Sequence, residues 1–481
     1  MLFSSLEFLF RFLPIFLVIY KFTPQKFKNL VLLIGSVAFY AFGEPVYVFL
    51  ILASILVNFF GAYRLHDLDD SIRRKGLFFF LMFADLGVLF VFKYFDFFAQ
   101  IVNSITGRGW VPQLQLTLPL GISFYTFQMI SVVVDIYTRK LEKRVYLIEF
   151  ATYICMFPQL IAGPIVQYQE VACELRRRTF SLAQVERGLC LFTLGLGSKV
   201  LLANKISIFW NQVQGIGFAN LSTPVAWLGA LAFSFQIYFD FWGYSLMAMG
   251  LGAMMGFSIP QNFDAPYISK SMTEFWRRWH MTLGRFFREY VYIPLGGSRR
   301  GLARTLGNTW VVFAVSGLWH GANWTFVVWG LLHALYLSGG LLLQKLRKNG
   351  EKRAHTAWYT GLMRLKVFAL ACIAWIFFRA DTLSDAVSVL GTMAAGLAHP
   401  GAYVRDVVEL LTAESAAVTA FTALSVAVLF CVDLLDERAD IMDGIGKLRP
   451  AVRYGLYVIF LAAMLLLIPK TAAAPFIYFQ F

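Results

Sequence analysis

Residues 316–334 read S-G-L-W-H-G-A-N-W-T-F-V-V-W-G-L-L-H-A, a largely apolar stretch that contains two histidines, His320 and His333. Apolar runs of this length predict membrane-spanning helices. An ionisable side chain at membrane depth costs free energy, so it is by default a candidate for function. Histidine has the side-chain pKa nearest neutrality, which suits it to proton transfer. The alternative is that each histidine hydrogen-bonds a nearby carbonyl group and holds two helices together.

The rest of the chain has a similar composition. Of its 481 residues, 59% are hydrophobic and 15% are charged, whereas soluble domains carry about 25% charged residues. We therefore predict an all-α, polytopic integral membrane protein, with about 11 or 12 transmembrane helices in a single domain over residues 1–481. The apolar runs are 1–20, 30–44, 46–63, 77–102, 116–137, 147–166, 188–210, 223–255, 306–324, 326–345, 367–378, 416–432 and 454–468.

Two of these runs are not simple spans. Pro158 and Gly163-Pro164 interrupt the run 147–166, and irregular backbone at membrane depth must be buried in protein or line a cavity. We therefore predict a re-entrant element there. The run 223–255 is too long for one simple span, so it is either one tilted helix or a helix followed by a re-entrant turn.

The basic residues predict the orientation of the chain. Its net charge of +14 comes mostly from short loops between apolar runs, where Lys and Arg mark the cytoplasmic side and meet anionic lipid head groups. This distribution argues against nucleic-acid binding. Residues 264–304, with eight Lys/Arg and three Asp/Glu, should be cytoplasmic, and residues 381–414, with five acids and one Arg, should lie outside. Both termini are then predicted to lie outside.

Several kinds of chemistry are not supported by the sequence. The five cysteines form no CxxC pair, so neither a zinc site nor a disulfide framework is indicated, and we predict no metal. The sequence contains no GxSxG, P-loop or HExxH motif.

The loop 264–304 mixes arginine with aromatic residues and contains F-W-R-R-W-H at 275–280. Arg277 and Arg278 offer planar donors for phosphate, and Trp279 offers a ring that can stack on a base. The loop could therefore hold the nucleotide part of an acyl carrier. The alternative is an amphipathic helix that anchors the protein to lipid, which has the same composition.

Two further segments contain candidate site residues. The helical pair predicted over 306–345 contains G-L-W-H-G-A-N-W at 317–324, in which Trp319 and Asn323 flank His320 and small residues would let a substrate or another helix approach. We predict that Trp319 and Asn323 contact the substrate or the donor. His333 could join them and orient this site, or only pack helices. At the C-terminus, Tyr478 lies in F-I-Y-F-Q-F, where a phenol is either an interfacial anchor or a nucleophile that needs a nearby base.

Together these segments resemble the membrane-bound O-acyltransferase (MBOAT) family, within it the bacterial branch of alginate and peptidoglycan O-acetyltransferase membrane subunits. The opening M-L-F-S-S, F-W-R-R-W-H with Y-I-P-L-G-G at 292–297, G-L-W-H-G with His333, and the terminal motif carry the resemblance. It implies that His320 is the catalytic histidine and His280 a second functional position. It also implies helices around a central tunnel, a bacterial cytoplasmic (inner) membrane location, and an extracytoplasmic SGNH-type partner.

These observations lead to one hypothesis. The donor, expected to be acetyl-CoA with no bound cofactor, docks near Arg277, Arg278 and Trp279, and His320 acts as general base on an acceptor hydroxyl. Tyr478 is either that acceptor, as an acyl relay to the partner, or a docking anchor. A transporter or flippase without covalent chemistry and a purely structural membrane subunit are the alternatives. The sequence leaves the polysaccharide and the acyl chain open.

Overall fold

The structure is a computed structural model that describes residues 1–346, 356–395, 400–412, 423, 426–427, 447–467 and 476. Tyr478 and most of the predicted span 416–432 lie outside the described residues. The described residues form helices, turns and irregular segments, with no strand among them, which confirms the all-α prediction. They divide into two compact units, one made of residues 1–192 and 244–261, the other of residues 193–243 and the described residues from 262 onward. The single-domain assignment stays a prediction.

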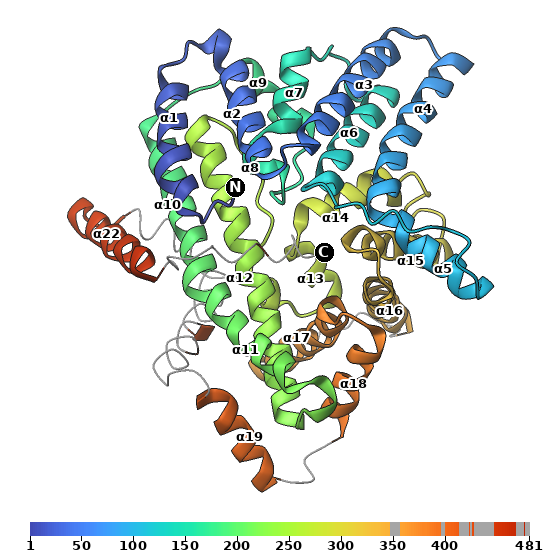
Figure 1. Ribbon diagram of the computed structural model, residues 1–481, viewed down its shortest axis with the longest axis vertical. Helices are drawn as coiled ribbons and strands as arrows, with labels where there is room; N and C mark the ends of the chain where they lie inside the picture. Colours follow the sequence, from blue (N-terminus) through green and yellow to red (C-terminus); the bar gives the residue numbers. More distant parts are fainter. Residues whose placement is uncertain are drawn as a thin grey trace. The chain divides into compact units, whose positions relative to one another are not determined.

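The helices of the first unit lie in the blue to green part of the chain (Figure 1). They are η1 Phe8–Phe12, α1 Leu13–Phe22, η2 Gln25–Phe27, α2 Lys28–Gly43, α3 Tyr47–Asp67, α4 Ile72–Leu89, η3 Phe90–Tyr94, α5 Phe95–Thr106, α6 Ile122–Tyr137, α7 Leu147–Cys155, α8 Phe157–Leu160 and α9 Tyr168–Arg176, with the start of α10 Leu182–Gly197 and the end of α12 Thr223–Met255.

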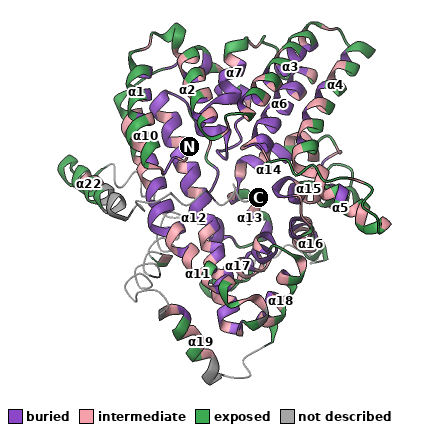
Figure 2. Cartoon of the chain, in the orientation of Figure 1, coloured by how far each residue is buried: buried purple, intermediate pink, exposed green. Residues whose placement is uncertain are grey.

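Helix α6 is the core of this unit. Nearly all of its residues are buried, and it appears almost wholly purple in Figure 2. Helices α3, α4, α7 and α9 pack around it. Because α6 is buried on every side, it takes the central position and its neighbours face outward. On α4, for example, Phe79, Phe80 and Phe83 are exposed and suit contact with lipid.

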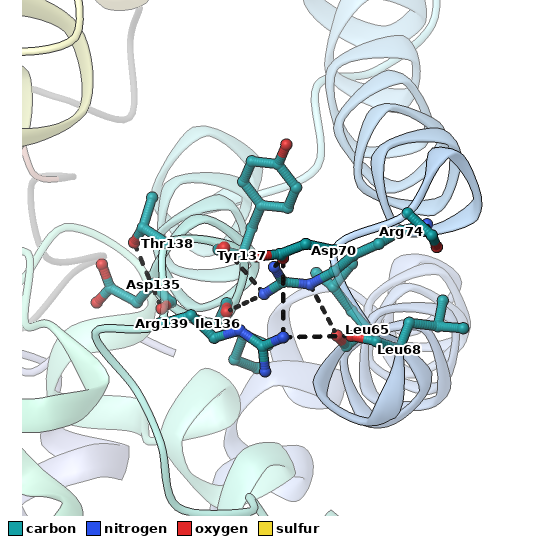
Figure 3. Close-up of polar contacts among 10 residues, drawn as sticks. Leu65, Leu68, Asp70, Arg74, Asp135, Ile136, Tyr137, Thr138 and Arg139 are labelled. Carbon is teal, nitrogen blue, oxygen red and sulfur yellow. Dashed lines mark hydrogen bonds and ion pairs between the residues drawn. The ribbon is translucent and has the colours of Figure 1, made fainter.

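Arg74 joins the end of α6 to the turn between α3 and α4 (Figure 3). Its guanidinium donates to the carbonyl oxygens of Ile136 (3.1 Å) and Tyr137 (2.9 Å), and its Nε donates to that of Leu65 (3.4 Å). The side chain of Asp70 accepts a further bond. Carbonyl groups in the last turn of a helix have no partner within the helix. Arg74 therefore donates hydrogen bonds to carbonyl groups at the ends of both α3 and α6.

The second unit contains the rest of the chain's described helices. They are the end of α10, η4 Ser198–Ala203, α11 Asn204–Ile216, η5 Phe218–Asn220, most of α12, η6 Pro266–Ile268, α13 Met272–Arg278, α14 Met281–Phe287, η7 Arg288–Tyr292, α15 Leu302–His320, α16 Trp324–Leu346, α17 Ala357–Arg379, α18 Leu383–Ala394, α19 Pro400–Thr412 and α22 Pro450–Leu467. Helices α15 and α16 form a hairpin, and α17 packs on α16 (Figure 1).

A buried ion pair lies within this unit. Lys199 in η4 contacts Asp240 in α12, with 2.8 Å between Nζ and Oδ1, and both side chains are almost completely buried. A charge inside a membrane-spanning segment is expected to find a partner. Asp240 is the partner of Lys199, the lysine that interrupts the predicted span 188–210.

The described helices confirm a multi-pass membrane protein. Seven helices in the described part of the chain are long and apolar enough to span a membrane; the total of 11 or 12 stays a prediction. The break within 147–166 is observed, since α7 ends at Cys155 and α8 covers only Phe157–Leu160. The run 223–255 is one continuous helix. Several predicted boundaries were wrong. Helix α6 begins at Ile122 after a turn, α15 ends at His320 rather than at 324, and α17 begins at Ala357 rather than at 367.

Candidate active site

His320 is the last residue of α15, where the chain turns into α16. Two glycines make this hairpin close. A Cβ atom on Gly317 would lie 2.4 Å from the carbonyl oxygen of Phe326, and one on Gly330 would lie 2.2 Å from that of Phe313. No side chain fits in such spaces, so glycine allows the backbones to meet. The next residue, Gly321, is extended and ends the helix. His320 is therefore buried at the turn.

Aromatic rings surround His320. The centre of its ring is 4.8 Å from that of Trp319, 4.9 Å from that of Trp329 and 5.2 Å from that of Phe378, each in an edge-to-face arrangement. The residue is 5% exposed. These contacts come from α15, α16 and α17, so three helices fix the position of the ring.

His280 is held by a polar contact. It precedes α14 in a left-handed conformation (φ 45°) and is 1% exposed. Its Nδ1 lies 3.0 Å from Oδ1 of Asn262, which also accepts from the backbone N–H (3.3 Å) and the hydroxyl (2.9 Å) of Thr282. A backbone N–H can only donate, so this atom of Asn262 is the oxygen, and Nδ1 of His280 must carry a proton.

The protonation of His280 follows from that contact and from burial. Burial lowers the pKa of His280 to about 3, so the ring is neutral near pH 7. With the proton on Nδ1, Nε2 holds a lone pair, and it has no hydrogen-bond partner among the described residues. His280 therefore presents an acceptor nitrogen that can receive a proton.

Trp319 contacts both histidines. Its ring centre is 6.2 Å from that of His280 and 4.8 Å from that of His320. Phe241 also contacts His280 edge-to-face at 4.7 Å. The structure thus brings together His280, Trp319 and His320, which the sequence analysis named as site residues from segments 40 positions apart.

His333 is fully buried in α16 and contacts Trp276 of α13. The indole Nε1 donates to Nδ1 of His333 across 3.3 Å. Because an indole nitrogen can only donate, Nδ1 of His333 must be unprotonated and the neutral ring carries its proton on Nε2. His333 therefore joins the arginine-aromatic loop to the helical pair, and its packing and orienting roles both stay predictions.

The three loop residues expected to bind the donor differ in exposure. Arg277 is exposed. Arg278 forms ion pairs with Glu274 (3.2 Å) and Asp264 (3.7 Å). Trp279 is 1% exposed and packs on Trp375, 4.8 Å between ring centres. Its ring is covered by protein, so stacking on a base would require it to leave this packing. The donor-binding role of the three residues stays a prediction.

Asn323 serves the turn between α15 and α16. Its Nδ2 donates to the carbonyl oxygen of Asp381 (3.0 Å), and its Oδ1 accepts from the N–H of Thr325 (3.0 Å). Asn323 therefore accepts a hydrogen bond from a backbone N–H in the first turn of α16 and links this turn to the chain after α17. A contact with substrate stays a prediction for Asn323, and Tyr478 lies outside the described residues.

Sequence reasoning missed four residues that complete this site: Asn262, Trp329, Trp375 and Phe378. Trp329 lies within the stretch 316–334, nine residues after His320, but helical spacing alone did not separate it from ordinary packing. Asn262 is isolated in a loop, and only the folded chain reveals its contact with His280.

An apolar cavity of about 750 Å³ lies beside α11, α12 and α17. Tyr267 lines it and also lies 6.0 Å from Trp279, ring centre to ring centre. Arg364 is its charged lining residue, and the Nε of this arginine donates to the carbonyl oxygen of Ile268 (3.0 Å). The lining suits hydrocarbon rather than the phosphates of a nucleotide.

No group of three or more His, Cys, Asp or Glu side chains that could hold a metal ion is found among the described residues. The site itself offers two buried histidines, one of them with a fixed acceptor nitrogen, within aromatic walls. Such an arrangement can move a proton in a place from which water is largely excluded.

Comparison with known proteins identifies the class. The sequence profile of the membrane-bound O-acyltransferase (MBOAT) family matches residues 138–379, which include both histidines of the site and the whole hairpin of α15 and α16. The chain belongs to this family and is an O-acyltransferase with several membrane-spanning helices.

Three relatives indicate its place within the family. The chain is 38% identical to a probable alginate O-acetylase of Pseudomonas putida, with 82% of this chain and 80% of the relative aligned. It is 35% identical to a peptidoglycan O-acetyltransferase of Helicobacter pylori, with 82% and 80% aligned. It is 24% identical to a teichoic acid D-alanyltransferase of Bacillus subtilis, with 54% and 68% aligned.

Proposed function

We propose that this enzyme transfers an acetyl group from acetyl-CoA at the cytoplasmic face to a hydroxyl acceptor on the outer side of the bacterial cytoplasmic membrane. The observation that carries the proposal is the position of His320, buried at the turn of a glycine-packed hairpin and in contact with Trp319, whose ring also contacts His280. Two buried imidazoles that contact one tryptophan suit proton transfer between a hydroxyl and a thiolate.

In the proposed reaction His320 acts as general base. The acceptor oxygen attacks the carbonyl carbon of the thioester while its proton passes to His320. When the carbon–sulfur bond breaks, the proton passes from His320 to the departing thiolate, and free CoA and an acetyl ester result. His280, with its lone pair on Nε2 fixed by Asn262, orients the acceptor or takes over the proton.

The donor is proposed to dock at the loop 264–304. Arg277 is exposed there, and a guanidinium binds phosphate through paired N–H donors. Arg278 already bonds to Glu274 and Asp264, so we assign it to holding the loop. Trp279, packed on Trp375, supports the loop from inside.

The acceptor is proposed to be a cell-surface or exported polysaccharide. The names of the Pseudomonas and Helicobacter relatives, an alginate O-acetylase and a peptidoglycan O-acetyltransferase, support this class. We infer that an extracytoplasmic SGNH-type partner completes the transfer and selects the glycan. Tyr478 either receives the acetyl group first as a relay or anchors the partner.

The test is release of CoA from acetyl-CoA by the purified enzyme in the presence of its partner. We expect His320→Ala to lower this rate by about 10²- to 10⁴-fold, the usual contribution of a general base, while the protein remains folded in the membrane. His66→Ala is the matched control, because this histidine lies in the other unit and bonds to the carbonyl oxygen of Glu142.

Two outcomes would contradict the proposal. If His320→Ala acetylates at the wild-type rate, His320 is not the base. If the wild-type protein releases no free CoA from acetyl-CoA even with its partner present, it is not an acetyltransferase. This second result would favour the alternative function, a transporter or flippase of a polysaccharide-modification system.

A further inference from the structure

A cluster of aromatic rings next to His320 contains buried N–H groups without an acceptor among the described residues. Trp329 and Trp375 are each 1% exposed and His333 is completely buried. Nε1 of both tryptophans and Nε2 of His333 have no hydrogen-bond partner among the described residues. Buried polar groups in folded proteins are nearly always paired, and each exception asks for an explanation, such as a ligand or water absent from the structure.

These groups belong to one cluster of rings. The ring centre of Trp329 is 5.9 Å from that of Trp375 and 4.9 Å from that of His333, and those of His333 and Trp375 are 6.5 Å apart. Trp329 is also 4.9 Å from His320. The unpaired groups therefore lie in one cluster of rings, which contacts the predicted base through Trp329.

All three groups are donors. An indole nitrogen always carries its proton and cannot accept. The Nε2 of His333 carries a proton as well, because Trp276 donates to the Nδ1 of the same ring. The cluster thus offers three N–H groups and needs an atom with lone pairs, so a cation or a hydrocarbon chain would leave the donors unsatisfied.

We propose that Trp329, Trp375 and His333 bind the carbonyl oxygen of the acyl thioester and stabilise the negative charge that forms on it. This inference rests on the proposed function and names the groups that bind the acyl end of the donor. When the acceptor oxygen attacks, the carbonyl π electrons move onto this oxygen, and they return when the carbon–sulfur bond breaks. N–H donors already in place within a dry site are most effective at this moment, because they need no reorganisation.

The test compares two unreactive donor analogues. Carba(dethia)acetyl-CoA has a methylene in place of sulfur and keeps the carbonyl oxygen, whereas S-ethyl-CoA has no carbonyl. We expect the wild-type enzyme to bind the ketone about tenfold more tightly or better, and Trp329→Phe and Trp375→Phe each to reduce this preference about threefold or more, since each removes one neutral hydrogen bond. With acetyl-CoA, we expect the same variants to lower kcat about 10²-fold with little change in KM.

Trp210→Phe is the matched control. Trp210 is equally buried and its Nε1 is also unpaired, but its rings contact Phe218 and Phe233 rather than the rings around His320. We expect this variant to keep both the preference for the ketone and the wild-type kcat. The melting temperature of each detergent-solubilised variant shows whether it is folded.

The outcomes separate the inference from the proposed function. Equal binding of both analogues by the wild-type enzyme overturns the inference and leaves the proposed function in place, and this comparison needs no variant. A preference for the ketone that survives in both Trp329→Phe and Trp375→Phe also overturns it. If the wild-type enzyme binds neither analogue and releases no CoA, the proposed donor itself is wrong.

Discussion

At the scale of single residues, the surroundings of His280 determine which nitrogen of its ring carries the proton. Its left-handed backbone costs a residue with a side chain about 1 kcal/mol. The backbone on either side is held, since the N–H of Met281 donates to the carbonyl oxygen of Asn262 (2.9 Å) and that of Asp264 donates to the carbonyl oxygen of Arg278 (3.0 Å). Strain retained by such contacts is typical of functional sites.

The lowered pKa of His280 predicts how stability depends on pH. The folded state keeps the ring neutral down to about pH 3, whereas the unfolded chain takes up a proton below its ordinary pKa of 6.5. Stability from this group is therefore present above pH 6.5 and is lost as the pH falls. Between pH 7.5 and pH 5 the loss should be about 2 kcal/mol.

The measurement is the thermal midpoint of the detergent-solubilised enzyme across this pH range. We expect His280→Gln to flatten the fall of the midpoint between pH 7.5 and pH 5, because the variant has no imidazole to protonate. His66→Gln should keep the slope of the wild type. Identical slopes in the wild type and His280→Gln would show that His280 does not titrate as its burial implies.

The residue scale also shows what the sequence could and could not predict. The burial of His320 and His333 follows from the apolar residues around them, and their positions were predicted. The contact between Asn262 and His280 and the packing of Trp279 on Trp375 were not, because they join segments that no periodicity relates. A tryptophan next to a pair of arginines has the same composition whether it faces a ligand or the core.

At the scale of helices, the hairpin of α15 and α16 positions the predicted base. Gly317 and Gly330 face the opposite backbone, whereas Gly307 in α15 and Gly339 in α16 have open space where a Cβ atom would be. Identical residues in the same two helices therefore have different roles. Only the first pair sets the distance between the helices.

This difference predicts opposite effects of one substitution. Gly317→Ala should destabilise the enzyme by about 1–3 kcal/mol, because its Cβ would meet the backbone at Phe326 and push the helices apart. Displacement of His320 by a fraction of an ångström should lower kcat about tenfold or more. Gly307→Ala should instead stabilise the helix by up to about 1 kcal/mol.

Thermal midpoints and CoA release measured on both variants test this prediction. A Gly317→Ala enzyme as stable and active as the Gly307→Ala control would mean that the close approach of the helices is not needed.

Helix boundaries were predicted well where the sequence carries its own signals. Proline and glycine in the run 147–166 marked the break between α7 and the short α8. The end of α15 at His320 was placed four residues too late, because the apolar composition continues through Gly321 and Trp324 while the backbone turns. Composition indicates where a chain can be buried, whereas the path depends on close contacts such as that of Gly317 with Phe326.

At the scale of the whole molecule, the proposed function requires the two sides of the membrane to be distinct. The loop 264–304 is basic and the segment 381–414 is acidic, and basic loops remain in the cytoplasm. The donor loop should therefore face the cytoplasm, where acetyl-CoA is made, and the segment after α17 should face outward, toward the acceptor.

Cysteine labelling tests this orientation in an active enzyme whose five cysteines (Cys155, Cys173, Cys190, Cys372 and Cys431) have been replaced. Ser298 and Ser384 are both exposed and carry the same side chain, so Ser298→Cys and Ser384→Cys form a matched pair. A membrane-impermeant maleimide should label Ser384→Cys in spheroplasts and Ser298→Cys only in inverted vesicles. If the pattern is reversed, the arginine-aromatic loop lies outside and cannot receive a cytoplasmic thioester. Since helix α15, which ends at His320, follows directly from this loop, such a result would remove the cytoplasmic donor from the proposed reaction while leaving membership of the acyltransferase family unchanged.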